Sequence, residues 1–201
     1  HNDVIMPRIA KDKEKKKERK RKMAEVFTPS WLCNRMLDDV DARLFGRNDV
    51  FNTKSNMDKE WQPVEYPVCR EGDGISWDAY VKKTVMEITC GEAPYLVSRY
   101  DTVSGMPIEL AERIGLLDRK LRVVSENTET TGEFLDWCQE AYKNTYGYEW
   151  QGDNLLLARE ALLFTFLDYY RAKFGEEPLL KSIQYIAYII SWNVWQMDGL
   201  K

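Results

Sequence analysis

Apolar residues recur every three or four positions along much of the chain, and this spacing places them on one face of an α-helix. In the first such segment, Thr28 and Pro29 suit the start of a helix and Gly46 its end. In the last segment nearly every position is bulky, so we expect a helix that is buried on most sides. The predicted helices cover residues 28–46, 107–125, 132–145, 154–174 and 181–197.

Two shorter segments favour β-strands. Residues 83–88 are an apolar, β-favouring run with Glu87 near its end, and residues 146–151 are short and aromatic. Each leads into a helix through a polar turn, as in α/β units. Residues 47–80 are rich in Asn, Asp, Gly and Pro, which predicts a long irregular connection held to the body of the protein by aromatic side chains. These aromatic residues are Trp61, Tyr66 and Trp77.

Helices greatly outnumber strands in this pattern, so the predicted fold class is a helix-rich α/β fold. The chain has 201 residues, of which 44% are hydrophobic, and this is enough for one substantial core. We therefore expect a single domain over residues 24–201, preceded by an arm over residues 1–23. The two predicted strands make an incomplete sheet, so either the chain is a fragment or its sheet is completed elsewhere.

The arm is defined by the run from Lys11 to Lys22, which holds nine basic residues, three acidic residues and no apolar one. Such a run cannot join a core, and it suits a solvated lead-in helix. It also suits an arm that contacts DNA phosphates, since clustered Lys and Arg gain affinity by releasing counterions from DNA. The net charge of the whole chain is -4, so a DNA-binding surface must be local. The candidate DNA-binding residues are Lys15, Lys16, Lys17, Arg19, Lys20, Arg21 and Lys22.

Cysteine and histidine usage argues against several kinds of site. Cys33, Cys69, Cys90 and Cys138 are far apart and form no Cys-x-x-Cys pair, so we expect no metal site. Reduced thiols are typical of cytoplasmic proteins. The only histidine is His1, which argues against histidine as a general base. No apolar run reaches the ~18 residues that span a bilayer and no signal peptide is visible, so we expect a cytoplasmic protein without a membrane partner.

The segment from Thr84 to Leu96 carries the strongest chemical signal. Its apolar run leads into Glu87, and a turn at Cys90 and Gly91 follows before apolar residues resume. A strand that ends in a carboxylate and a glycine turn brings one anionic acceptor and several backbone amides to the same point. That arrangement suits the ribose and the amino-acid end of a nucleoside cofactor.

Two segments resemble those of a known family. Residues 25–37 read Glu-Val-Phe-Thr-Pro-Ser-Trp-Leu-Cys-Asn-Arg-Met-Leu and resemble the Phe-x-Thr-Pro segment of adenine-N6 DNA methyltransferases. Residues 87–96 resemble the S-adenosylmethionine loop of that family, acid-Pro-Ala-Cys-Gly-x-Gly-x-Phe-Leu. Both segments occur in the family's order. The resemblance implies a Rossmann-like, S-adenosylmethionine-dependent methyltransferase fold, in the cofactor-binding part of a restriction–modification methylase subunit.

The reaction implied by the resemblance is transfer of a methyl group from S-adenosyl-L-methionine to adenine N6. The implied partners are double-stranded DNA and other restriction–modification subunits. By the same resemblance, Glu87 holds the cofactor's ammonium group or an ordered water, and Phe27, Thr28 and Pro29 close the pocket from the N-terminal side. The residues implied to shape the turn and present backbone amides are Thr89, Cys90, Gly91 and Ala93.

The chain departs from the family pattern inside this turn. Ile88 replaces the usual proline, and Ala93 stands where the family prefers a second glycine. An alanine that must adopt a positive φ is strained by ~1 kcal/mol or more. We therefore expect a turn that is distorted or has a reduced affinity for the cofactor.

Residues 149–160 resemble the family's second segment, in which an acid at the end of strand two accepts hydrogen bonds from the ribose hydroxyls. Glu149 and Asp153 are both candidates for this acid, and Trp150 could stack on adenine. Asp153 is equally suited to cap the helix that follows. An alternative in which residues 117–120 form the ribose segment is rejected, because Asp118 is predicted on the polar side of an amphipathic helix. The Asp-x-Lys pattern at Asp118 and Lys120 has no Pro-Asp partner upstream, which argues against a Mg²⁺ nuclease.

No Pro-Pro pair occurs in the chain, although amino-methyltransferases bind the target base with a polar-Pro-Pro-aromatic motif. Asn193 in Ser-Trp-Asn-Val-Trp is the nearest look-alike, but its surroundings favour a structural role. The catalytic residues are therefore unknown. Two alternatives stay open: a catalytically inactive partner of methyltransferase fold that binds DNA or a sister subunit, and a helical scaffold without a cofactor.

Overall fold

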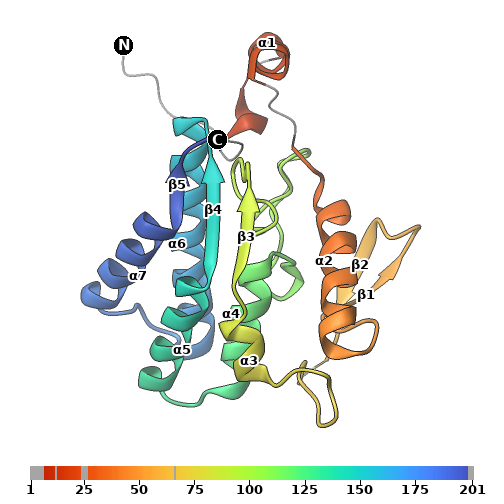
Figure 1. The fold of residues 1–201 in the computed structure, drawn as a ribbon, viewed down its shortest axis with the longest axis vertical. Helices are drawn as coiled ribbons and strands as arrows, with labels where there is room; N and C mark the ends of the chain where they lie inside the picture. The colour runs from red at the N-terminus through yellow and green to blue at the C-terminus, as the bar shows by residue number, and fades with distance from the viewer. Residues whose placement is uncertain (1–6, 12, 24–26, 66, 199–201) are drawn as a thin grey trace.

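The computed structural model describes residues 7–11, 13–23, 27–65 and 67–198, except for the side chains of residues 15, 22 and 23. Within this part of the chain, a parallel sheet of three strands in the order β3-β4-β5 forms the centre of the fold (Figure 1). The strands are β3 (Val85–Ile88), β4 (Thr145–Glu149) and β5 (Val194–Gln196). The predicted α/β class is confirmed, and so are both predicted strands.

Two α-helices lie between each pair of successive strands of this three-stranded sheet. They are α4 (Leu116–Asn127) and α5 (Thr131–Lys143) between β3 and β4, then α6 (Gly152–Phe174) and α7 (Leu180–Asn193) between β4 and β5. Local signals fix some of their ends. Thr130 caps α5 in a reciprocal pair with Glu133, and α6 ends at Gly175, whose φ of 72° is left-handed.

The helix predicted over residues 181–197 is wrong in two respects. It ends at Asn193, and the next three residues form β5, which pairs with β4. It is also not buried on most sides, because Tyr185, Tyr188 and Trp192 are exposed. The pattern could not reveal this strand, because long-range pairing with β4 and not local propensity makes these residues extended.

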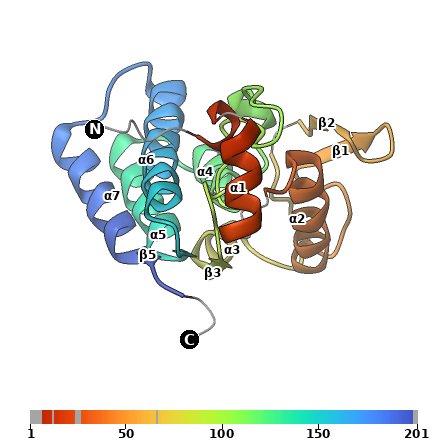
Figure 2. The ribbon, with the colours of Figure 1, turned by 90° about the horizontal axis from the view of Figure 1, so that it is seen from above.

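Helices of the described residues cover only one face of the sheet. Side chains alternate between the faces of a strand, and the register places Met86, Ile88, Tyr146, Tyr148 and Trp195 together on one face. Met86, Ile88 and Trp195 are exposed there. Figure 2 shows α4 and α6 on the other side of the strands. Parallel sheets are normally buried on both faces, whereas in the described part of the chain helices cover only one face.

The N-terminal part of the domain stands beside β3, on the side away from β4 (Figure 1). It comprises α2 (Ser30–Phe45) and the antiparallel hairpin of β1 (Asn52–Ser55) and β2 (Glu60–Pro63). The next helix, α3 (Trp77–Lys82), lies below β3 in Figure 1 and packs against α4 and α5.

The prediction of an irregular connection over residues 47–80 is therefore wrong in part, since it contains the hairpin and α3. Two of its aromatic residues do contact the body of the protein. Trp61 Nε1 donates a hydrogen bond to the Glu112 carbonyl at 2.8 Å, and the Trp77 ring lies 4.5 Å from that of Trp137, measured between centroids. Tyr66 lies outside the described residues.

The start of α2 differs by one residue from the prediction. Pro29 is the N-cap and Ser30 the first helical residue, whose amide donates to Asp101 Oδ2 at 2.7 Å. Thr28 therefore does not cap the helix. The predicted end is confirmed, because Gly46 takes the left-handed conformation with a φ of 74°.

The helix predicted over residues 107–125 is replaced by a short 3-10 helix, η2 (Leu110–Glu112), and by α4, which begins only at Leu116. The chain turns at Gly115, where an added Cβ would lie 2.5 Å from the Leu96 carbonyl oxygen. Asp118, predicted on a polar and solvated side, is fully buried. Its carboxylate accepts hydrogen bonds from the amides of Ser98 and Gly115 at the start of the helix.

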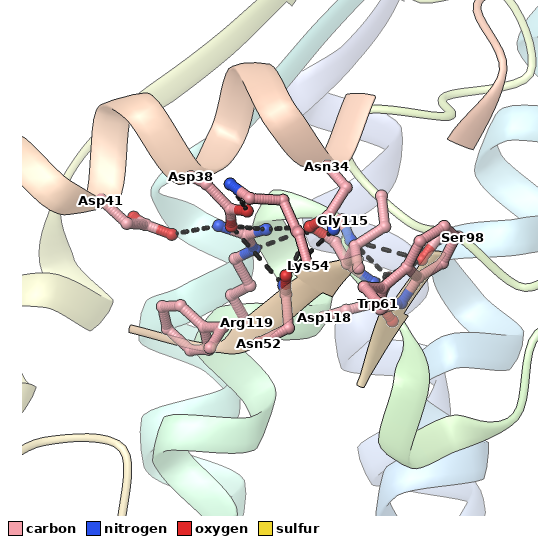
Figure 3. A network of polar contacts seen from close by, with 12 residues as sticks. Asn34, Asp38, Asp41, Asn52, Lys54, Trp61, Ser98, Gly115, Asp118 and Arg119 are labelled. Carbon is pink, nitrogen blue, oxygen red and sulfur yellow. Dashed lines mark hydrogen bonds and ion pairs between the residues drawn. The ribbon is translucent and has the colours of Figure 1, made fainter. Parts of the chain in front are cut away.

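Arg119 joins α2 to α4 (Figure 3). Its buried guanidinium group forms ion pairs with Asp38 and Asp41, and it donates to Asn34 Oδ1 at 2.7 Å. Asn34 also exchanges hydrogen bonds with Asn52 at the start of β1. This buried network fixes the position of α2, whose first turns form a wall of the pocket described below.

The predicted basic arm is helical in its described part. A short helix, η1 (Arg8–Ala10), is followed by α1 (Lys13–Met23). Figures 1 and 2 show α1 lying over the carboxyl ends of the strands.

Candidate functional site

A pocket of about 670 Å³ lies at the carboxyl ends of β3 and β4. Such a volume is typical of sites for small molecules and cofactors. Among the described residues that line it, the only charged side chains are Glu87 and Glu149. Many of the others are aromatic or carry sulfur: Phe27, Met36, Met86, Cys90, Tyr95 and Trp150.

Glu87 is the least satisfied polar group of this pocket. Its Oε2 atom is buried and has no hydrogen-bond partner in the structure. Burial, together with the nearby charge of Glu149, raises the pKa of Glu87 well above its ordinary value. A buried and unpartnered acceptor is costly, so it is a common mark of a functional site.

Glu149 is held in place by backbone amides. Its Oε2 atom accepts a hydrogen bond from the Gly91 amide at 2.7 Å, and its Oε1 atom accepts one from the Gln151 amide at 2.9 Å. Glu149 therefore ties the end of β4 to the turn that follows β3.

That turn uses backbone conformations that side chains rarely adopt. Thr89, Gly91 and Ala93 have φ angles of 60°, 58° and 64°. For a β-branched residue such as Thr89 this is an outlier, and such strain persists at functional sites. At Gly91 an added Cβ would lie 2.6 Å from the Phe27 ring, so the position also requires glycine for space.

The prediction that this turn presents backbone amides to a cofactor is wrong for three of its residues. The Cys90 amide donates to the Tyr148 carbonyl at 2.8 Å, the Gly91 amide to Glu149, and the Ala93 amide to the Cys90 carbonyl at 2.7 Å. These amides are occupied because the turn closes on itself and on β4. Ala93 has the predicted positive φ, but it is fully buried and does not line the pocket.

The N-terminal segment reaches the pocket as predicted for two of three residues. Phe27 and Thr28 line it, whereas Pro29 serves as the N-cap of α2. Cys33 and Cys90 are buried nearby, and burial raises the pKa of the Cys33 thiol to about 12. Burial likewise raises the pKa of Cys90, so neither thiol is a ready nucleophile.

Asp153 is not a pocket residue, in contrast to the prediction. Its carboxylate forms ion pairs with Arg19 at 2.9 Å and with Lys11 at 3.1 Å. Burial acts to raise the pKa of Asp153, but the hydrogen bonds from Arg19 and Lys11 outweigh it and lower the pKa. The alternative role as N-cap is also wrong, because Gln151 holds that position.

The arm is thus anchored to the domain by Lys11 and by Arg19, of which Arg19 was predicted to contact DNA. Arg19 faces Asp153, and Lys16 donates to the Ile9 carbonyl at 2.8 Å. The side chains of Lys15 and Lys22 lie outside the described residues. The basic residues of α1 that are exposed are Lys13, Lys17, Lys20 and Arg21.

Trp150, which was expected to stack on adenine, lines the pocket, and Tyr95 lines it as well. Both lie in segments that carry the resemblance. Other pocket residues were not among those predicted from the sequence. Met36 and Met86 carry no such signal, because only the tertiary fold brings α2 next to β3. Asn193 is structural, since its side-chain amide donates to three backbone carbonyls at the end of α5 and the start of β4.

Comparison with known proteins gave no match to any family model, any curated protein or any solved structure. No group of three or more His, Cys, Asp or Glu side chains in the described part of the chain could hold a metal ion. None of its described helices is both long enough and apolar enough to cross a bilayer.

Proposed function

We propose that the chain binds S-adenosylmethionine in the pocket at the ends of β3 and β4, as a DNA adenine-N6 methyltransferase-like subunit of a restriction–modification system. The observation that carries the proposal is that two acidic side chains, Glu87 and Glu149, line this pocket and that no described basic side chain does. One carboxyl oxygen of Glu87 is buried there without a hydrogen-bond partner. The resemblance of residues 25–37 and 87–96 to the family supports the same function.

The charge of the pocket narrows the class of ligand. Nucleotide cofactors with phosphate groups need cationic side chains or free backbone amides, and this pocket offers two acidic side chains instead. S-adenosylmethionine has no phosphate, and its sulfonium and ammonium cations outweigh its single carboxylate. Aromatic faces also attract cations, and Tyr95 and Trp150 supply such faces. The donor set therefore fits this cofactor better than a dinucleotide.

The roles of the residues follow from their chemistry. Glu87 would accept hydrogen bonds from a cationic group, and Glu149 would accept them from ribose hydroxyls with its remaining lone pairs. Trp150, which is exposed beside the pocket, offers a planar surface to adenine. The bound cofactor supplies an electrophilic methyl group, and the task of the protein is to align it with the acceptor amine.

The exposed side of α1 supports DNA as the partner. Lys13, Lys17, Lys20 and Arg21 are exposed on a helix that lies over the carboxyl ends of the strands. Clustered cations of this kind bind nucleic-acid phosphates by counterion release. Ion pairs of Lys11 and Arg19 with Asp153 hold that helix on the domain.

Calorimetric titration of the protein with S-adenosylmethionine tests the cofactor. We expect binding by the wild type, loss of binding in Glu87→Ala, and unchanged binding in Glu160→Ala, which alters an exposed carboxylate on α6. Absence of binding by the folded wild type would refute the proposal. Transfer of a tritiated methyl group to unmodified DNA then separates an active subunit from an inactive partner that only binds.

The DNA surface is tested with a variant in which Lys13, Lys17, Lys20 and Arg21 are all alanine, so that the anchoring ion pairs stay in place. We expect weaker DNA binding and a salt dependence that flattens by ~0.9 in log–log slope for each lost phosphate contact. Unchanged affinity in this variant would exclude α1 as the DNA surface.

A further inference from the structure

The two carboxyl groups of the pocket differ in their surroundings, although they stand at the ends of adjacent strands. Glu149 is fixed by two backbone amides, whereas Glu87 Oε2 is buried without a partner. The titratable groups that interact with Glu87 are Glu149 from β4, Cys90 from the turn, Cys33 from α2 and Tyr95 from the segment after the turn. All four are neutral or negative, so nothing among them stabilises an ionised Glu87.

We propose that Glu87 holds a proton while the pocket is empty and releases it to solvent when a positively charged ligand enters, so that the pocket selects cations. The inference rests on the proposed function, because it concerns the same pocket. It adds that the pocket is selective for positively charged ligands.

The exchange balances in charge and atoms. A neutral Glu87 carboxyl group and a cationic ligand become a carboxylate paired with that cation, and one proton passes to the buffer. The bound cation replaces the missing partner of the Oε2 atom, so the ionised form is stabilised only in the complex. A neutral ligand of the same shape brings no such charge, and it leaves the proton on Glu87.

Burial first and Glu149 second raise the pKa of Glu87 well above its ordinary value, which is the direction that a proton on the empty pocket's carboxyl group requires. If binding of a cationic ligand removes this proton, the affinity for that ligand depends on pH. Affinity should rise by up to about tenfold for each pH unit, as long as the empty pocket is protonated and the complex is not.

The experiment is calorimetric titration near neutral pH in several buffers of different ionisation enthalpy, which counts the protons released on binding. The first ligand is S-adenosylmethionine. The second is 5′-methylthioadenosine, which has the nucleoside and thioether but neither cation. We expect the wild type to release close to one proton with S-adenosylmethionine and none with 5′-methylthioadenosine.

Two variants sharpen the result. Glu87→Gln resembles the protonated carboxyl in shape, so it should fold, bind S-adenosylmethionine more weakly and release no proton. Glu160→Gln, at an exposed carboxylate, should behave as the wild type.

The outcomes are distinguishable. Binding of S-adenosylmethionine without proton release overturns this inference and leaves the proposed function standing, whereas no binding at all overturns both. Equal proton release with 5′-methylthioadenosine overturns it as well, because the ligand's charge is then irrelevant, and this result needs no variant to fold.

Discussion

Replacing Arg119 by methionine should be among the most damaging single changes in this protein. Methionine keeps much of the side chain's length but removes the charge that Asp38 and Asp41 share (Figure 3). Asp41 is almost fully buried and would keep only the hydrogen bond from the Tyr80 hydroxyl. Lys54 stays paired with Asp38, so the larger loss falls on Asp41.

The magnitude follows from the burial of the pair. Removing one partner of a buried ion pair costs about 3–5 kcal/mol, because the other charge stays buried without compensation. Domains are stable by about 5–15 kcal/mol, so the loss is a large share of the total. For a chain of this size it corresponds to a fall in Tm of about 6–20 °C.

Urea unfolding of the wild type and of Arg119→Met measures this loss. Arg43→Met is the matched control, since Arg43 is exposed on α2 and should cost less than about 0.5 kcal/mol. In the double variant Arg119→Met/Asp41→Asn part of the stability should return, because the uncompensated carboxylate is gone. The deficit of the single variant should also shrink as the pH is lowered from neutral, because burial raises the pKa of Asp41 above its ordinary value and a bound proton removes the uncompensated charge. A loss below about 1 kcal/mol at neutral pH would refute the reasoning.

Three further changes give expectations that are simple to measure. Thr89→Gly should stabilise the protein by about 0.5–1 kcal/mol in urea unfolding. Glycine removes the backbone strain of a left-handed residue, and this gain exceeds the entropic cost of glycine. Destabilisation would show that Thr89 is not strained. Gly91→Ala should destabilise by about 1–3 kcal/mol in the same assay, since the new Cβ meets the Phe27 ring at 2.6 Å. Burial, aided by the charge of Lys83, lowers the pKa of Lys120 from 10.5 to about 7. Between about pH 7 and pH 10.5 the unfolded chain therefore binds more protons at this residue than the folded chain does. The free energy of unfolding should rise with pH over this range. Lys120→Met should abolish this rise, and an unchanged pH profile would contradict the assignment.

The elements that sequence reasoning located well are those whose ends depend on neighbouring residues. Gly46 and Gly175 stop helices through their own left-handed conformation, and Thr130 caps a helix through a side chain three residues from its partner. β5 and the start of α4 depend on distant contacts instead. The three residues of β5 are extended because β4 lies beside them, and the chain turns at Gly115 because the Leu96 carbonyl approaches it.

The same distinction applies to the site. The positions of Glu87 and Glu149 could be predicted, since both follow from a strand that ends in an acid. The sequence could not predict which backbone amides remain free to bind a ligand, because the Gly91 amide donates its hydrogen bond to Glu149 on the neighbouring strand. Asp153 was a candidate for the pocket because residues 149–160 resemble the family's second segment. Only the fold shows that Lys11 and Arg19 from the arm pair with its carboxylate.

The location of the pocket gives support that does not depend on the resemblance. In open α/β sheets, ligands bind outside the carboxyl ends of the strands, at the point where the order of the strands reverses. In the sheet β3-β4-β5 the first strand along the chain is β3, and the pocket lies at the carboxyl end of that strand. The buried and unpartnered oxygen of Glu87 lies at that end, so the topology and the chemistry indicate the same place.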